Sequence, residues 1–141
     1  MAKAILYFTI ALVFFGCQEF AIKEKLIDNY YLIATDAGDD CSLSYHEPTD
    51  GNNYGGVIEA TVFAVGYNKS YLIAKQHPRT FPKLADKTIT NYYILPLKKG
   101  MDWRIKNGLI GPLSIEQFNQ TRKELKIPDS LSFSKVMEDL K

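Results

Sequence analysis

Short runs of aromatic and β-branched residues alternate with polar turn residues through the middle of the chain. Such runs, bounded by Gly, Pro, Asn and Asp, are typical of β-strands. The longest run, 57–67, is followed by Asn68-Lys69 and a second apolar run, 70–76. Because Asn tolerates the left-handed conformation of a tight turn, residues 57–76 predict a β-hairpin, and Gly66 within it indicates a bulge. We expect about five strands, in the ranges 30–35, 41–46, 57–67, 70–76 and 88–97.

The C-terminal part of the chain changes to a helical period. Ser114 is followed three residues later by Gln117, which is the spacing of a capping box at a helix start. Apolar residues at Phe133, Val136, Met137 and Leu140 repeat at intervals of three and four, which predicts a second short helix. Short turns favour an antiparallel meander. We therefore predict an α+β fold, in which one sheet of about five strands is followed by two C-terminal helices packed on one face.

The N-terminal segment predicts export. Lys3 precedes an apolar run, 4–16, that is shorter than the roughly 20 residues of a membrane-spanning helix. The small residue Gly16 directly before Cys17 resembles the lipobox of bacterial lipoproteins, although Phe14 stands where leucine is usual. The resemblance implies cleavage before Cys17 and attachment of lipid to its thiol. A plain signal peptide and an uncleaved anchor are the alternatives.

This assignment divides the chain into a signal peptide (1–16), a lipidated tether (17–28) and one globular domain (29–141). Loss of Lys3 from the 17 basic and 16 acidic residues leaves a balanced charge, which gives no electrostatic argument for nucleic acid. The membrane is instead the partner expected through Cys17. Cys41 is then the one remaining thiol, so we expect no internal disulfide, no zinc site and no cofactor.

Five segments of the sequence, taken in order, resemble those of a known protein family. They are YYLIATDAGDD, CSLSYH, VFAVGYNKSYLIAKQHP, ITNYYILPL and GPLSIEQF. Together they resemble an uncharacterised family of small bacterial lipoproteins that carries a domain of unknown function, over roughly residues 25–130. The resemblance implies an anchored single domain and transfers no functional residue.

Two groups of residues could carry chemistry. The turn that holds Asp36, Asp39 and Asp40 is rich in carboxylates, but its spacing does not fit a calcium loop, and a solvated turn is expected. His46 and His77 each follow a predicted strand, and with a nearby Asp either could act as a general base. The sequence has no G-x-S-x-G, H-E-x-x-H or Walker motif, so we do not expect an enzyme.

A binding surface is better supported. His77 and Arg79 flank Pro78 in a loop, and arginine suits forked contacts with carboxylate or phosphate. All nine tyrosines but Tyr7 lie in the domain, and tyrosine is enriched in binding surfaces. Because adjacent strand residues point to opposite faces, each of the pairs 30–31 and 92–93 places one ring on an uncovered face. The candidate binding residues are Tyr31, Tyr71, Tyr93, His77 and Arg79.

The sequence therefore predicts a protein lipid-anchored to the bacterial cell envelope, with a domain that binds a protein or peptide partner. Two alternatives remain open at this point. One is a small envelope hydrolase that uses His46 or His77 with an Asp. The other is an inhibitor or immunity-type protein that blocks another enzyme.

Overall fold

The computed structural model describes residues 20–49, 51–98 and 108–141 and consists mainly of β-structure. Two antiparallel sheets are present, in the orders β1-β2-β3-β4 and β8-β7-β6-β5-β9. We call them the four-stranded and the five-stranded sheet. The strands are β1 (Ile22–Lys25), β2 (Tyr30–Ala34), β3 (Ser42–His46), β4 (Tyr54–Ile58), β5 (Val62–Tyr67), β6 (Tyr71–Gln76), β7 (Asn91–Pro96), β8 (Ile110–Leu113) and β9 (Lys135–Val136), with a 3-10 turn η1 (Gly38–Asp40) and one α-helix, α1 (Ile115–Glu124).

The prediction of a single sheet is wrong because the apolar run 57–67 is two strands. β4 ends at Ile58 and belongs to the four-stranded sheet, whereas β5 begins at Val62 and belongs to the five-stranded sheet. Thr61 and His77 exchange two backbone hydrogen bonds of 3.0 Å, which start the pairing of β5 with β6. The chain therefore changes sheets over residues 59–61, and the hairpin prediction is confirmed only for β5 and β6.

The predicted second helix is also wrong. The four apolar residues assigned to it contact different parts of the protein instead of one common face. Phe133 packs with the cluster around Phe118, whereas Met137 and Leu140 pack against the core between the sheets. Val136 lies in β9, which pairs with β5, and is 38% exposed. An extended segment satisfies these separate contacts, and a helix with one apolar stripe does not.

Glycine is needed at position 66 for a reason other than a β-bulge. It pairs regularly with Ile73, and the irregularity in this hairpin lies between Val62 and Ala64. A Cβ atom at Gly66 would lie 1.8 Å from the carbonyl oxygen of Ser132. The C-terminal segment therefore crosses β5 so closely that only glycine fits below it.

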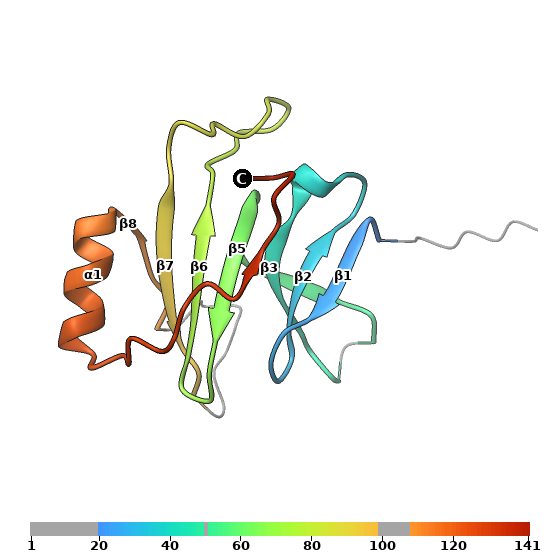
Figure 1. The fold of residues 1–141 in the computed structure, drawn as a ribbon. Coiled ribbons are helices and arrows are strands. Elements are labelled where there is room, and N and C mark those ends of the chain that lie inside the picture. Colours follow the sequence, from blue (N-terminus) through green and yellow to red (C-terminus); the bar gives the residue numbers. More distant parts are fainter. Residues whose placement is uncertain (1–19, 50, 99–107) are drawn as a thin grey trace, which may run out of the picture.

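The molecule has three layers, with the four-stranded sheet on one side, the five-stranded sheet in the middle and α1 on the other side (Figure 1). The largest core lies between the two sheets and contains Leu32, Leu43, Leu72 and Leu95, each no more than 1% exposed. A second core lies between the five-stranded sheet and α1, around Phe118. The four-stranded sheet thus has an inner face in the core and an outer face.

The start of α1 follows the prediction. Ser114 accepts a hydrogen bond from the backbone N–H of Gln117, and the Gln117 side chain accepts one from the backbone N–H of Ser114. The four-stranded sheet begins before residue 29, the predicted start of the domain. Residues 22–25, which the sequence analysis assigned to the tether, form β1 and pair with β2.

Candidate binding site

The outer face of the four-stranded sheet carries a cluster of aromatic rings, Phe20, Tyr31, His46 and Tyr54, which we call the aromatic patch. His46 and Tyr54 are opposite each other on β3 and β4, with ring centroids 4.9 Å apart. Tyr54 meets Tyr31 at 5.2 Å and Phe20 at 5.7 Å, both in edge-to-face geometry. Such contacts hold the rings in defined orientations and preorganise the surface.

Residues with small side chains lie beside the patch. Ser44 is the cross-strand partner of Tyr31, and Gly56 is the partner of Ser44. A Cβ atom at Gly56 would meet no ring and only Oε1 of Glu59 at 3.6 Å, so the Glu59 carboxylate lies near this position. The patch therefore follows from strand register, which brings together residues up to 34 positions apart in the printed sequence.

Lysine side chains lie beside the patch at the β1 edge of this face, and the carboxylate of Glu59 lies near Gly56 on β4, at the opposite edge. Lys23 places its Nζ atom 5.2 Å from the ring centroid of Tyr54 and 5.4 Å from that of Phe20. Lys25 lies on the same face, because it pairs with Tyr31. The strand positions that point outward here include no carboxylate; they are Lys23, Lys25, Tyr31, Ile33, Ser42, Ser44, His46, Tyr54 and Gly56. Among the described residues, no helix or strand covers this face (Figure 1).

The three tyrosines predicted to bind do not share one surface. Tyr31 belongs to the aromatic patch, whereas Tyr71 lies on the face below α1, and its hydroxyl donates to the carbonyl oxygen of Leu125 at 3.4 Å. Tyr93 is buried between the sheets and donates to Oε1 of Gln76 at 3.2 Å. Burial, followed by the charge of Glu59, raises the pKa of Tyr93. The alternation of side chains along a strand predicts that adjacent tyrosines point to opposite faces of the sheet. It does not predict which face of the sheet remains uncovered.

His77 and Arg79 have internal partners. His77 is 4% exposed, stacks on Phe63 at 4.2 Å and shares a hydrogen bond of 2.7 Å between Nδ1 and the carbonyl oxygen of Ile89. The Arg79 guanidinium binds the carboxylates of Asp39 and Asp40. Arginine thus makes the forked contact expected of it, but with this chain's own acidic turn. The ion pairs of Arg79 with these two aspartates hold the loop after β6 against η1.

Neither histidine forms a hydrogen bond to a carboxylate within the described residues, although the charge of His77, after the hydrogen bonds from Thr88, contributes to lowering the pKa of Asp86. His46 lies on the outer face of the four-stranded sheet, and its Nε2 is 2.7 Å from the carbonyl oxygen of Gly51. His77 bonds to a carbonyl instead, and its Nε2 has no hydrogen-bond partner among the described residues. Within the same residues, no group of three or more His, Cys, Asp and Glu side chains is placed to hold a metal ion.

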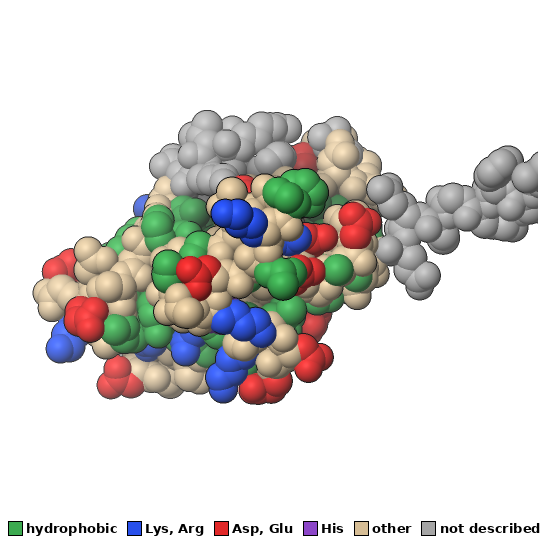
Figure 2. Space-filling view, turned by 90° about the horizontal axis from the view of Figure 1, so that it is seen from above, with side chains coloured by type: hydrophobic (Ala, Val, Ile, Leu, Met, Phe, Trp, Pro, Cys, Tyr) green, Lys and Arg blue, Asp and Glu red, His purple; other side chains and the backbone are tan. Residues whose placement is uncertain are grey.

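The loop between β6 and β7 carries exposed apolar side chains that the sequence prediction missed. Phe81 is 83% exposed, Leu84 78% and Ile89 47%. The view onto this end of the molecule shows hydrophobic side chains at the surface next to lysine and arginine side chains (Figure 2). The signal in the sequence was the position of Phe81 between Pro78 and Pro82, with Leu84 two residues after Pro82, because prolines disfavour a central strand there.

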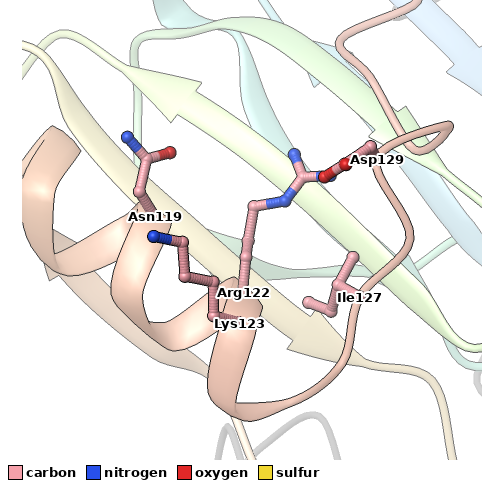
Figure 3. Close-up of a pocket in the computed structure, with 5 residues that line it drawn as sticks. All are labelled: Asn119, Arg122, Lys123, Ile127 and Asp129. Atoms are coloured by element: carbon pink, nitrogen blue, oxygen red, sulfur yellow. The ribbon is translucent and has the colours of Figure 1, made fainter.

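A shallow pocket lies at the C-terminal end of α1 and is lined by Asn119, Arg122, Lys123, Ile127 and Asp129 (Figure 3). Arg122 lines it but is already engaged, because its Nη2 donates to the carbonyl oxygens of Pro128 at 2.9 Å and Leu131 at 2.8 Å. These bonds hold the chain after the helix against its end. We assign this pocket a structural role.

One of the two cysteines, Cys41, lies within the described residues. Cys41 is fully buried, and burial, followed by the charge of Glu24, raises the pKa of its thiol to about 12. Such a thiol is unreactive at neutral pH. Cys17, the predicted lipid attachment site, and the apolar run 4–16 lie outside the described residues. No helix within the described residues has the length and apolar character needed to span a membrane.

The fold and the patch define a two-sheet β-protein with a single helix and an open aromatic sheet face. Residues 27–137 match the family model described as protein of unknown function (DUF3997), and the chain belongs to that family. The resemblance to a domain of unknown function is thereby confirmed, whereas the bacterial lipoprotein assignment stays a prediction. No curated protein and no solved structure gives a match.

Proposed function

We propose that this protein is lipid-anchored to the bacterial cell envelope through Cys17 and that its aromatic patch binds a protein or peptide partner. The observation that carries the binding role is the preorganised cluster of Phe20, Tyr31, His46 and Tyr54 on an open sheet face. Aromatic rings are enriched at protein interfaces and supply much of their binding free energy. The anchor is supported by the sequence Gly16-Cys17 after a short apolar run.

The chemistry of the patch favours a partner with acidic or carbonyl groups. Lys23 and Lys25 add positive charge beside the rings, whereas the carboxylate of Glu59 lies near Gly56 on β4, at the opposite edge of the sheet. Opposite charge on a partner increases the association rate and fixes its orientation. The rings then supply apolar contact area at low entropic cost, because a tyrosine side chain has only two rotatable χ angles.

The experiment starts from the lipidated protein in its own envelope. The protein is cross-linked, captured through a C-terminal tag, and its stoichiometric partner is identified by mass spectrometry. The purified partner is then titrated against the wild type and the variants Tyr31→Ala and Tyr54→Ala. Each variant is expected to lose about 2 kcal/mol of binding free energy, or roughly 30-fold in affinity, which is typical of a central interface residue.

Tyr67→Ala is the matched control, because Tyr67 is also an exposed tyrosine but lies at the turn between β5 and β6. Its affinity is expected to stay within about 0.5 kcal/mol of the wild type. An affinity unchanged in both patch variants would refute binding through the aromatic patch. A partner that is itself an enzyme, inhibited on complex formation, would place the protein in the inhibitor class with the same surface.

A further inference from the structure

The loop of residues 79–90, which lies between β6 and β7, carries three exposed large hydrophobic side chains. Phe81 and Leu84 are 83% and 78% exposed, the highest values among the large hydrophobic side chains of the described residues, and Ile89 is 47% exposed. A concentration of exposed apolar side chains on one element marks an interaction site. We call this element the apolar loop.

The apolar loop is fixed at several points along its length. Nε of Arg79 donates to the carbonyl oxygen of Lys83 at 3.0 Å, while its guanidinium binds the acidic turn η1. Lys87 donates to the carbonyl oxygens of Asp139 at 3.3 Å and Lys141 at 3.0 Å. The anchored loop therefore keeps its apolar side chains pointing outward without further ordering.

The same end of the molecule holds the start of the described chain. A methyl group at Gly38, beside the Asp39 that binds Arg79, would lie 4.0 Å from Cδ1 of Ile22. Ile22 follows Phe20 by two residues, and Cys17 precedes Phe20 by three. Three extended residues span about 10 Å. A lipid on Cys17 would thus hold the bilayer surface close to the end of the molecule that carries the apolar loop.

The composition of the apolar loop suits a lipid surface. Phe81, Leu84 and Ile89 are apolar, and the basic side chains Lys83 and Lys87 flank Leu84 in the sequence. Lysine side chains can extend their charged ends toward headgroups while their stems lie along apolar surface. Asp86 is the one carboxylate within residues 79–90. Arg79 is paired with Asp39 and Asp40, and Lys87 donates to carbonyl oxygens of the C-terminal segment. Within the described residues, Lys83 is therefore the basic side chain of the loop that is left to face headgroups beside the apolar centre.

We propose that the apolar loop inserts into the headgroup–acyl boundary of the bilayer, next to the lipid on Cys17. This inference rests on the lipid anchor of the proposed function. The inserted loop would fix the tilt of the domain relative to the bilayer. The anchor supplies membrane affinity, and the loop supplies orientation.

The experiment uses the full-length chain, expressed in bacteria, purified from the membrane fraction and reconstituted into vesicles of phosphatidylethanolamine and phosphatidylglycerol. The single tryptophan, Trp103, is first replaced by Phe. One variant then carries Phe81→Trp. The matched control carries Tyr67→Trp, an exposed aromatic residue at the opposite end of β5 and β6. Quenching by brominated phospholipid and by aqueous iodide is measured for both.

We expect brominated phospholipid to quench the tryptophan at position 81 at least twofold more than the one at position 67, and iodide to show the reverse order. Equal quenching by bromolipid at both positions, in a protein whose intact mass shows lipid on Cys17, would overturn the loop inference and leave the anchor standing. A membrane-fraction protein without lipid mass would overturn the anchor and the inference with it. A fall in iodide quenching at position 81 that occurs only after the protein partner is added would also overturn the loop inference, because the loop would then be a protein contact.

Discussion

Gly66→Ala tests the crossing of the C-terminal segment over β5. The new Cβ would lie 1.8 Å from the carbonyl oxygen of Ser132 and 2.8 Å from its carbonyl carbon. Carbon and oxygen atoms in proteins approach to about 3.3 Å, so the backbone of the segment must move by roughly 1.5 Å. Both atoms belong to backbone, and no side-chain rotation relieves the contact.

The free-energy cost follows from this displacement. Overpacking in a well-packed region costs about 1–3 kcal/mol. Displacing the segment also exposes part of Leu131, which is 4% exposed and whose full burial is worth about 2 kcal/mol. Replacing glycine by alanine lowers the conformational entropy of the unfolded chain, which offsets at most about 1 kcal/mol of this cost. We therefore expect Gly66→Ala to lower the free energy of unfolding by about 3 kcal/mol.

The assay is urea unfolding of a soluble form that begins at Gln18, followed by circular dichroism. Gly56→Ala is the control, because Gly56 also lies in a strand but its Cβ would meet only the side-chain Oε1 of Glu59 at an ordinary 3.6 Å. This control should stay within about 0.5 kcal/mol of the wild type. Equal stabilities of the two variants would refute the close crossing and with it the extended C-terminal segment.

Three further predictions follow from individual contacts. Stability is expected to fall at alkaline pH, by up to about 1.4 kcal/mol per pH unit for each group, because burial raises the folded-state pKa of Cys41 from 9.0 and of Tyr30 from 10.0 to about 12 in both cases. The stabilising contribution of these groups is complete below pH 9 and is lost as pH rises toward 12. Cys41→Ala should remove the loss of stability that begins near pH 9. A stability that does not depend on pH up to pH 11 would contradict the prediction. Arg79→Ala should loosen the apolar loop, so that trypsin cleaves after Lys83 at least tenfold faster in the variant than in the wild type, and an unchanged cleavage rate would show that the contacts of Arg79 do not hold the loop. Tyr93→Phe should cost about 1 kcal/mol in unfolding free energy, because it removes one of two donors to Oε1 of Gln76, and a variant as stable as the wild type would show that Asn91 alone satisfies that oxygen.

Local signals in the sequence predicted local structure well. The capping box from Ser114 to Gln117 is formed by neighbouring residues, so the start of α1 could be placed before any tertiary contact was known. β2 and β3 each lie within one residue of their predicted ranges, because aromatic and β-branched runs end there at acidic or proline-containing turns.

The division into two sheets had no equally local signal. Residues 57–67 form a run with only Glu59 and Thr61 as polar interruptions, and such a run is compatible with one long strand. The change of sheet depends on the backbone bonds from Thr61 to His77 and from Val62 to Cys41. These partners are distant in the sequence. The spacing of Phe133, Met137 and Leu140 was ambiguous for a related reason, because an extended segment between two cores also needs apolar residues at irregular intervals.

The candidate site was predictable only in part. The abundance of tyrosine pointed to a sheet face, and Tyr31 does lie on one. Phe20 and Tyr54 were not singled out, because their contact depends on the register of β1 to β4 and on where the chain enters the domain. Arg79 resembled a recognition residue because a free arginine and a paired one look alike until Asp39 and Asp40 are located.

The most direct test of partner binding through the aromatic patch is photo-cross-linking in living cells. A photoreactive phenylalanine analogue is placed at position 54 in the patch or at position 67 at the far turn, in otherwise unchanged full-length protein. The account predicts one abundant cross-linked species from position 54, which disappears with Lys23→Glu, and none from position 67. The same cross-linked species from both positions, or none from position 54, would contradict binding through the aromatic patch.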